Sequence, residues 1–373
     1  MRRLVILLTL AAAAFAQRHK LEEVNAEKPE GKLLQQIMQE NDAAKKAALM
    51  EQFASEFPKA DSSAWVLEQL QANYVKANDP DKIIASGEKL LAVDPDDPEA
   101  ALQCLKAAEA KHDVALVRKW SATTSANARK MAGRPKPADA EQAESWKNEV
   151  DYAKQVGTYS DYALYRAALE SRDPKLTIEL AEELTQRNPS SEYVQKVADP
   201  LFVAYRQAGA NDKALALAEK VLATDQSNED MLLVETDHLM QAKKEPEKVH
   251  AYSAKIVQVM AAKPKPEGMS DADWTARKNL VVGLAHYMSG KLYYNEAKFA
   301  PADTELHAAL PLVESNATLK PEVLYLLGFA NYKLDKPQEA ANYYKECAAI
   351  KSPFQATAAK NLQGLHAQYR GLK

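Results

Sequence analysis

The chain has 373 residues, of which 46% are apolar and 27% are charged, and its formal net charge is −4. This composition provides a sizeable core and excludes both an acidic disordered chain and a strongly basic nucleic-acid-binding protein. Only 11 glycines are present, about 3% against a usual ~7%, while helix-forming residues dominate. An extensive β-sheet protein is therefore excluded. At roughly 100 to 200 residues per domain, the length fits two or three ordinary domains or one elongated array.

The first sixteen residues are predicted to be a secretory signal peptide. Arg2 and Arg3 precede an apolar run, and Ala14-Phe15-Ala16 forms a cleavage signature before Gln17. The alternative, an uncleaved membrane anchor, requires ~20 apolar residues, which is more than this run offers. Cleavage would remove two positive charges and leave 357 residues with a net charge of −6. We therefore expect an exported product, periplasmic or secreted, that has no membrane insertion and no nucleic-acid partner.

Two cysteines, Cys104 and Cys347, lie 243 residues apart in the sequence. Each lies in an apolar stretch with helical spacing, and free cysteine is among the most buried residue types. A chain of this size does not depend on disulfides for stability. We expect two buried thiols, with stability supplied by packing.

Internal repetition is the main organising signal in the chain. Residues 131–137 (MAGRPKP) match residues 260–266 (MAAKPKP) at an offset of 129, and Trp146 then matches Trp274 at an offset of 128. At an offset of 131, Pro58 matches Pro189, Tyr74 matches Tyr205 and Lys89 matches Lys220. Two large units of about 130 residues are implied. An incomplete third copy follows, since Ala214 in residues 211–214 (NDKA) matches Ala340 in residues 337–340 (PQEA) at an offset of 126.

A shorter repeat of roughly 34 residues lies within each large unit. It is best seen in residues 321–353, where Leu324-x-x-Leu327-Gly328 begins one helix, Asp335-Lys336-Pro337 forms a turn, and Ala340-x-x-x-Tyr344 lies on a second helix before Pro353. Apolar residues recur every three or four positions, as on a packed helix. The small residues Gly328 and Ala340 are predicted to lie where the two helices approach most closely.

Other copies of this pattern follow along the chain. Residues 64–95 contain Leu67-x-x-Leu70-Gln71-x-x-Tyr74, then Ile83-x-x-x-Gly87, then Asp94-Pro95. Further copies are Asp161-x-x-Leu164 with Leu184 and Pro189, Ala198-x-x-Leu201-Phe202-x-x-Tyr205 with Ala214-x-x-x-Ala218, and Ser289-Gly290-x-x-Tyr293 with Ala302-x-x-x-Leu306. Weaker hairpins are predicted at about 31–58, 97–131 and 228–262.

These motifs resemble the tetratricopeptide repeat (TPR) family, whose pattern is W-x-x-L-G-x-x-Y, then A-x-x-x-F, then P. The chain departs from that pattern where Leu324 or Leu67 stands for the Trp, Asn331 for the Tyr and Ile83 for the Ala, and where Pro353 comes one residue late. The resemblance covers nearly all of the chain after the signal peptide. It implies an all-α fold, a right-handed α-solenoid of about eight TPR-like helical hairpins over residues 31–353.

Two Pro-Lys-Pro segments interrupt the array, near residues 132–145 and 261–273. Because a residue before proline is forced out of the helical region, each segment ends one helix and forms an exposed elbow. An apolar stripe that includes Trp146 or Trp274 then predicts a helix of more than standard length. An elbow is either an insertion tolerated in a loop or a dedicated docking element, and its sequence does not decide between them.

The two ends of the array are predicted to differ. Phe354, Ala358, Leu362, Leu365 and Tyr369 recur every three or four positions, so residues 354–373 form an amphipathic helix. A terminal repeat needs such a cover with a polar outer side, and we expect this helix to cap the array. Residues 17–30 have no sustained apolar stripe and are predicted to be a flexible N-terminal segment.

The sequence contains no motif that points to catalysis, a metal or a cofactor. None of the seven histidines has the paired spacing that builds a zinc site on one helix, and no phosphate-binding loop or nucleophile elbow occurs. Glu179, Glu182 and Glu183 are interpreted as a solvated helix surface. We therefore expect a non-catalytic protein without cofactor or metal, although a site built from residues distant in sequence would leave no motif.

The resemblance also implies where a partner binds. In TPR arrays the first helix of each hairpin lines a concave groove that receives a partner's segment. Transferred to this chain, the residues that line the groove are Tyr162, Arg166, Tyr287, Lys291, Tyr294, Tyr325, Phe329, Tyr332 and Lys333. Aromatic and basic side chains together suit an extended or helical peptide with a carboxylate. The alternative is that several of these tyrosines pack between neighbouring hairpins.

Three functions are consistent with these features. The first is a non-catalytic interaction scaffold or adaptor of the cell envelope that binds a partner peptide or protein in the groove. The second is an assembly or regulatory subunit of an envelope complex that docks through the elbows. The third is a hydrolase or glycan-binding protein on a helical frame, which would need a deep pocket with converging carboxylates. The sequence does not identify the partner, the pathway or the oligomeric state.

Overall fold

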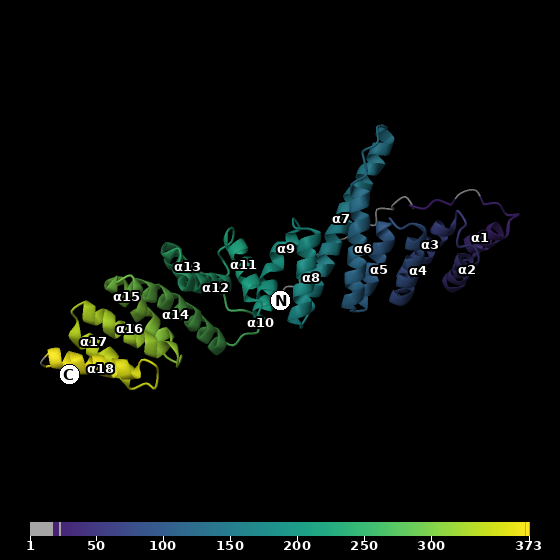
Figure 1. The fold of residues 1–373 in the computed structure, drawn as a ribbon. Helices are drawn as coiled ribbons and strands as arrows, with labels where there is room; N and C mark the ends of the chain where they lie inside the picture. Colours follow the sequence, from purple (N-terminus) through teal and green to yellow (C-terminus); the bar gives the residue numbers. More distant parts are fainter. Residues whose placement is uncertain (1–17, 22–23, 370, 373) are drawn as a thin grey trace. The chain divides into compact units, whose positions relative to one another are not determined.

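The computed structural model describes residues 18–21, 24–369 and 371–372. These residues form eighteen α-helices and one short 3-10 helix, with no strand among them, and the all-α prediction is thereby confirmed (Figure 1). The predicted signal peptide lies outside the described residues. Among the helices that are described, none is both long enough and apolar enough to cross a bilayer. The chain divides into two compact units between Ala208 and Gly209, and each unit is described by itself.

The N-terminal unit contains ten helices among its described residues. They are α1 (Pro29–Gln39), α2 (Ala43–Glu56), α3 (Ser63–Ala77), α4 (Pro80–Val93), α5 (Pro98–Ala110), α6 (Val114–Ala132), α7 (Ala140–Glu170), α8 (Pro174–Arg187), α9 (Glu192–Lys196) and α10 (Ala198–Gln207). Helices consecutive in the chain pack on one another from α1 to α8. The short helix α9 was not predicted from the sequence.

The C-terminal unit contains the remaining helices. They are α11 (Asn211–Leu222), α12 (Glu229–Ala242), α13 (Pro246–Ala262), α14 (Asp271–Asn295), α15 (Phe299–Ala309), η1 (Leu310–Leu312), α16 (Leu319–Lys333), α17 (Pro337–Ala348) and α18 (Gln355–Gln368). Consecutive helices again pack on one another. Seven of the predicted hairpins lie wholly within one unit, whereas α10 and α11 of the remaining hairpin belong to different units.

The sequence explains where several helices begin. At α4, α5 and α8 the residue before the helix is an aspartate and the first helical residue is a proline. The aspartate side chain accepts a hydrogen bond from a backbone N–H that has no partner in the helix, as Asp97 does from Glu99 and Ala100. Proline fits the first helical position, since its missing N–H would have been unpaired there.

In five of the hairpins the first helix is followed by a non-glycine residue in the left-handed region. Its φ is 53° at Asn78, 54° at His112 and Lys243, 57° at Ala297 and 56° at Asp335. Such a residue ends the first helix and reverses the chain direction, and the next helix begins within a few residues. In the turn between α12 and α13, Glu245 is left-handed as well, with a φ of 47°. The predicted turn at Asp335-Lys336-Pro337 is confirmed, since α16 ends at Lys333 and α17 begins at Pro337.

Both Pro-Lys-Pro segments connect helices that are longer than most of the others, as predicted. The first elbow follows α6, which has 19 residues, and precedes α7, which has 31. The second follows α13, with 17 residues, and precedes α14, with 25. In Figure 1, α7 extends beyond the other helices of the N-terminal unit. At its tip, Trp146 Nε1 donates a hydrogen bond to the carbonyl oxygen of Arg134 at 2.9 Å.

The last helix, α18, lies within the residues that were predicted to cap the array. It packs against α17, and Ala358 and Leu365 are its buried residues. At the other end of the chain, Arg18, Leu21 and Val24 contact the N-terminal unit before α1 begins. All three residues belong to the segment 17–30 that was predicted to be flexible, so part of that segment is packed against the N-terminal unit.

Candidate partner-binding faces

Helices α14 and α16 are the first helices of neighbouring hairpins, and they contact each other. Tyr287, Lys291 and Tyr294 follow one another at intervals of four and three residues on α14. Tyr325, Phe329 and Tyr332 do so on α16. Such intervals place each set on one side of its helix. The structure therefore brings seven of the nine predicted residues, these six and Lys333, onto two adjacent helices.

Phe329 lies at the centre of an aromatic cluster. Its ring centroid is 5.3 Å from that of Tyr294, 5.9 Å from that of Phe299 and 6.5 Å from that of Tyr332. The Nζ of Lys333 lies 5.3 Å from the Phe329 centroid and 5.8 Å from the Tyr332 centroid. We call these five residues the C-terminal aromatic face. Aromatic pairs at such separations gain stability beyond the area that they bury.

The C-terminal aromatic face is only partly covered by the rest of its unit. Its four aromatic residues are half-buried and Lys333 is exposed. Lys333 forms no ion pair with any residue that the structure describes, so its ammonium group is held only by the two rings. Phe299, at the start of α15, was not predicted as a site residue, because it belongs to the second helix of its hairpin.

Tyr287 and Lys291 form an internal network instead. Lys291 Nζ donates to Glu322 Oε1 at 2.7 Å and to the Tyr287 hydroxyl at 2.8 Å. Burial raises the pKa of Tyr287 to about 12. Burial opposes the charge of Lys291, but its hydrogen bonds to Glu322 and Tyr287 outweigh that effect and raise its pKa. Through Glu322, these two residues link α14 to α16. They therefore pack between neighbouring hairpins, the alternative to partner binding that the sequence also allowed.

Tyr325 contacts the end of the array. Its ring centroid lies 6.0 Å from that of Tyr344 on α17 and 5.3 Å from that of Phe354, the residue before α18. Tyr325 is half-buried. It therefore joins the last hairpin to the terminal helix, on the same side of α16 as Phe329.

Tyr162 and Arg166 lie in the N-terminal unit, on α7. The ring of Tyr162 lies between those of Tyr159, at 6.1 Å, and Tyr193, at 5.6 Å. Tyr193 belongs to α9, the helix that was not predicted, and it also stacks on Tyr165 at 5.3 Å. Tyr193 therefore covers part of the surface that the sequence assigned to a partner.

Two polar side chains at this cluster already have carboxylate partners. Arg166 is exposed and bonds to Glu170 at 2.5 Å one turn later on α7. The Tyr159 hydroxyl donates to Glu109 at 2.6 Å, and burial together with this carboxylate raises the pKa of Tyr159. The cluster is therefore a packed junction of α5, α7 and α9, and Lys106 on α5 lies 5.7 Å from the centroid of the Tyr159 ring.

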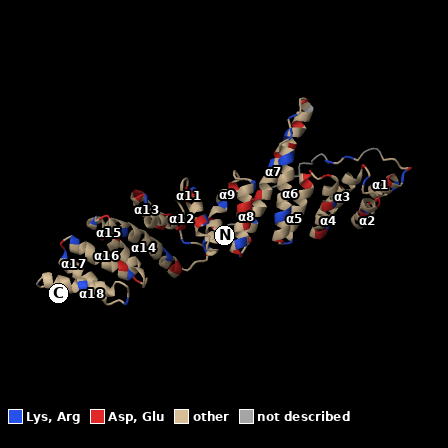
Figure 2. Cartoon of the chain, viewed as in Figure 1, with Lys and Arg blue, Asp and Glu red and all other residues tan. Residues whose placement is uncertain are grey.

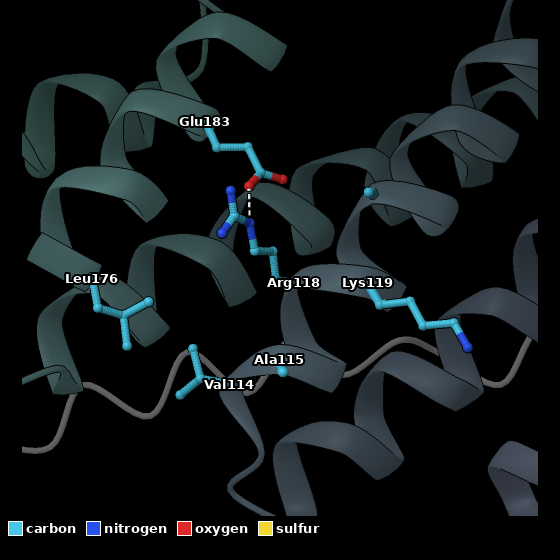
Figure 3. Close-up of a pocket in the computed structure, with 7 residues that line it drawn as sticks. Val114, Ala115, Arg118, Lys119, Leu176 and Glu183 are labelled. Carbon is cyan, nitrogen blue, oxygen red and sulfur yellow. Dashed lines mark hydrogen bonds and ion pairs between the residues drawn. The ribbon is translucent and has the colours of Figure 1, made fainter.

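The helical carboxylates interpreted as solvated hold specific partners. Arg118 on α6 bonds to Glu183 at 2.5 Å and to Glu179 at 3.0 Å, as Figure 3 shows for Glu183. Glu182 accepts a hydrogen bond from the Tyr205 hydroxyl at 2.7 Å. Arg118 and Glu183 line an open depression of about 680 Å³ between α6 and α8, together with Val114 and other residues. In this depression the Glu183 carboxylate is bound by Arg118, so the two residues form an ion pair that links α6 to α8.

A second open depression, of about 850 Å³, lies in the C-terminal unit beside the second elbow. Its walls are the start of α14, from Asp271 to Leu280, and the segment from Pro311 to Asn316. Leu280 is 42% exposed. Both depressions are open, unlike the deep pocket that a hydrolase would need.

One group among the described residues has the composition of a metal site. His19, Asp94 and Asp97 each offer one ligand atom, and these atoms lie within 4.8 Å of one another. Arg18 Nε donates to Asp94 Oδ2 at 2.6 Å, so a guanidinium group already occupies one of the oxygens. Sequence motifs did not point to this group, because His19 lies 75 residues before Asp94.

Charges of both signs are interspersed along the helices of each unit (Figure 2).

No family model matches the chain, and no curated protein matches it in sequence. The solved structures that are similar to it include the following two. The crystal structure of the P58(IPK) TPR domain has 12% identity and a TM-score of 0.27, over 92% of this chain and 100% of that one. The yeast Tom70 structure has 11% identity and a TM-score of 0.22, over 92% of this chain and 97% of that one.

The packing of the helices defines the class of protein. The chain is an all-α repeat protein built from helical hairpins, each of which buries its apolar side against its neighbours. Away from the long helices that flank the two elbows, the hairpins have the length and the tight turn of tetratricopeptide-like repeats, as the sequence motifs implied.

Proposed function

We propose that this protein is a non-catalytic interaction scaffold or adaptor of the cell envelope, and that it holds a segment of a protein partner on the C-terminal aromatic face. The observation that carries this proposal is the arrangement around Phe329. Three half-buried aromatic rings surround it, and Lys333 lies beside it with no carboxylate partner among the described residues. A cation that has no carboxylate partner among the described residues and lies next to half-buried rings is suited to bind a carboxylate.

The chemistry of the face indicates the kind of segment that fits it. Aromatic rings provide a large contact area at low entropic cost, and they accept an apolar side chain. Lys333, about one helical turn after Phe329, supplies a positive charge for a carboxylate. We therefore propose a partner segment in which an apolar side chain lies close to an acidic residue or to the carboxyl terminus of the partner.

The cell envelope forms part of this proposal because of the predicted signal peptide. Residues 1–16 have the positive start, apolar run and cleavage signature of export. We propose that the chain acts in the periplasm or outside the cell, after the signal peptide has been removed.

A second candidate function uses the first elbow. Helix α7 extends beyond its neighbours in the N-terminal unit (Figure 1), and residues 133–139 form the tip of the resulting arm. An arm of this kind could serve as the contact of an assembly or regulatory subunit within an envelope complex. On this alternative, partner binding depends on the tip and not on Phe329.

One experiment separates the two. The chain from Gln17 onward, carrying an affinity tag, is incubated with envelope extract from its own cell, and captured proteins are compared among variants. The face variant combines Tyr332→Ala with Lys333→Ala, and its control is Lys336→Ala, which removes an exposed lysine that pairs with Asp303 at 3.3 Å. A third variant replaces residues 134–138 with glycine and serine.

We expect the face variant to lose a protein that the wild type and Lys336→Ala retain. Equal recovery by the face variant and the control would contradict the proposed face, and loss with the tip variant alone would support the second function. The thermal unfolding of each variant is followed by its helical circular dichroism, and only variants that are folded at the temperature of the capture experiment are compared.

A further inference from the structure

The turn between α14 and α15 joins two rings of the C-terminal aromatic face. Tyr294 lies at the end of α14, and Phe299 is the first residue of α15. Their ring centroids are 6.2 Å apart, at an interplanar angle of 77°. Within the turn, Ala297 is left-handed, and Lys298 N donates to the carbonyl oxygen of Tyr293 at 2.9 Å. A change in this turn would therefore be felt at the face.

An ion pair closes the turn. Lys298 Nζ lies 3.0 Å from Glu296 Oε2, and the lysine side chain is 59% exposed. Lys298 directly precedes Phe299, and its four-carbon stem is flexible. Its ammonium group can therefore reach the face once Glu296 no longer holds it.

His250, on α13, approaches the same carboxylate. Its ring stacks on that of Tyr293, with the centroids 3.8 Å apart, and its Nδ1 lies 2.9 Å from Ser289 Oγ on α14. Its Nε2 is buried and has no hydrogen-bond partner among the described residues. This nitrogen lies 3.9 Å from Glu296 Oε2, about 1 Å longer than a usual hydrogen bond. The ring is thus bonded at one nitrogen and stops short of Glu296 at the other.

The charge of the His250 ring affects which cation Glu296 binds. A neutral imidazole has one N–H group, whereas the charged ring donates from both nitrogens. The charged ring attracts the carboxylate and repels the ammonium group of Lys298, since both cations lie near the same oxygen of Glu296. Protonation of His250 therefore favours a Glu296–His250 pair over the Glu296–Lys298 pair.

We infer that His250 is a pH-sensitive switch of the C-terminal aromatic face, and that its protonation transfers Glu296 from Lys298 to His250. In the neutral state, Lys298 is paired and the face offers Lys333. In the charged state, Lys298 becomes available beside Phe299 to a carboxylate of the partner. A partner with a carboxylate binds the charged state better, and this difference in affinity couples binding to the proton. The inference rests on the proposed function of the face.

The charged groups around His250 come from several elements. Burial lowers the pKa of His250 below its usual 6.5, and Lys298 adds to this effect. Three carboxylates oppose it, namely Glu296 after α14, Glu305 on α15 and Glu247 on α13 itself. Burial prevails, so the ring is neutral at pH 7.

Other titratable groups near these helices already have partners. Glu305 pairs with His286 of α14 at 2.7 Å. Helix α12 also packs on α13, and its Glu235 pairs with Lys248 at 3.4 Å.

The lowered pKa fixes the direction of the pH dependence. The unfolded chain takes up a proton at this histidine near pH 6.5, and the folded chain does so at a lower pH. The stability of the neutral state is therefore fully present above about pH 6.5 and decreases as pH falls toward the lowered value. The switch thus operates in the mildly acidic range.

The first experiment follows the switch without a partner. The chain from Gln17 onward is labelled with ¹³C-histidine and 4-fluorophenylalanine, and NMR spectra are recorded from about pH 8 to about pH 5. The His250 signal, assigned by its loss in His250→Gln, should titrate below pH 6.5. The fluorine signal of Phe299, assigned with Phe299→Tyr, should move with the same midpoint. This movement should be lost in His250→Gln.

Two charge-neutral variants test the transfer of Glu296 in opposite directions. Glu296→Gln removes a carboxylate that favours the charged ring, so the midpoint of His250 should fall further. Lys298→Gln removes the opposing ammonium group, so the midpoint should rise. The matched control is His238→Gln, which removes an exposed histidine of α12 and should leave the signals of His250 and Phe299 unchanged.

The second experiment measures binding at the face. The probe is N-acetylphenylalanine, which carries an aromatic ring beside a carboxylate that stays ionised above about pH 5. Its affinity is obtained from the fluorine signal of Phe329. In the wild type the affinity should be about two- to five-fold higher at the acidic end of the titration, which is the contribution of one exposed ion pair. In Lys298→Gln the affinity should not depend on pH.

Several results would overturn the switch. The first is a Phe299 signal that does not follow His250, or that moves equally in His250→Gln. The second is a His250 midpoint that both Glu296→Gln and Lys298→Gln leave unchanged. The third is probe binding of equal strength at both ends of the titration.

Failure of the proposed function looks different. Absence of probe binding at every pH would overturn the face and its regulation, while the transfer of Glu296 would still be decided by the first experiment. If His250→Gln does not fold, Glu296→Gln and Lys298→Gln decide, since both substitutions lie in a turn that is partly exposed.

Discussion

The ring of Tyr344 on α17 packs directly against the backbone of Gly328 on α16. A Cβ atom at Gly328 would lie 2.7 Å from two ring carbons of Tyr344, closer than van der Waals contact permits. Tyr344 is almost completely buried, at 2% exposure. The glycine thus sets the distance between the two helices of this hairpin, and the prediction of a close approach at Gly328 is confirmed.

Gly328→Ala is expected to destabilise the protein, because the new methyl group must push Tyr344 or the whole of α17 away. Overpacking of this kind costs roughly 1–3 kcal/mol. Gly364→Ala is the matched control, since this glycine lies on α18 and a Cβ there meets no atom within 4 Å. Alanine at an open helical position stabilises by about 1 kcal/mol. Urea unfolding of both variants checks the prediction, and equal effects would contradict the packing role of Gly328.

The two cysteines are expected to be unreactive in the folded protein. Both are buried and neither forms a disulfide. Burial raises the pKa of Cys104 to about 12 and that of Cys347 to about 11, so almost no thiolate is present at pH 8. Ellman's reagent should report no thiol in the native chain at pH 8 and two in guanidinium chloride. Rapid reaction of either thiol without denaturant would show that its helix opens.

Glu229→Gln is expected to weaken the C-terminal unit. This carboxylate is 1% exposed and bonds to Lys263, at the end of α13, and to Arg277 on α14, at 3.0 Å. It therefore holds both helices that flank the second elbow. Because the two cations are more than one third exposed, we expect a loss of about 1–3 kcal/mol, less than for a fully buried pair. The free energy of unfolding in urea at pH 7 measures it.

The control for Glu229 is Asp271→Asn, which breaks the exposed pair between Lys265 and Asp271 at the same elbow and should cost less than ~1 kcal/mol. Burial opposes the charge of Glu229, but Lys263 and Arg277 outweigh it and lower its pKa below the usual 4.5. Its stabilisation is therefore present above about pH 4.5 and is lost as pH falls through the lowered value. The difference between wild type and Glu229→Gln should shrink in that range; a constant difference would contradict the ion pair.

Trp146→Phe is expected to loosen the tip of the α6–α7 arm without unfolding the unit. The substitution removes the hydrogen bond from Trp146 Nε1 to the carbonyl oxygen of Arg134, which contributes about 0.5–1.5 kcal/mol. Trypsin should then cleave faster after Lys147, which is exposed beside the tip, while the urea midpoint of the whole chain stays close to that of the wild type. Unchanged cleavage would contradict this role of Trp146.

Much of the fold could be read from local patterns. The spacing of apolar residues, the Asp-Pro helix starts and the turn at Asp335 are properties of neighbouring residues, so they predicted the hairpins to within a few residues of their observed bounds. The contact of Gly328 with the second helix was also accessible, because the repeat pattern fixes which positions of two adjacent helices meet. Helix α9 was missed, since five residues are too few for a periodic pattern.

The candidate site was only partly accessible. The sequence placed Tyr294, Phe329, Tyr332 and Lys333 on the first helices of adjacent hairpins, and the structure groups them. It did not show that Lys291 is held by Glu322 or that Tyr193 covers Tyr162, because each contact joins residues that lie about 30 positions apart. Side-chain partners over such distances depend on how the hairpins pack.

By itself, the order of residues determined that this chain forms helices of a given length, joined in pairs and continued by stacking, because those properties follow from backbone preferences and from burial of apolar stripes. Tertiary structure alone decided which charges are free. Among the described residues it left Lys333 without a carboxylate and paired Lys291 with Glu322. It also brought Arg18 onto Asp94 and His19 onto Asp97 from 76 and 78 residues away. Ionic pairing acts through space, so only the packed helices could select these partners.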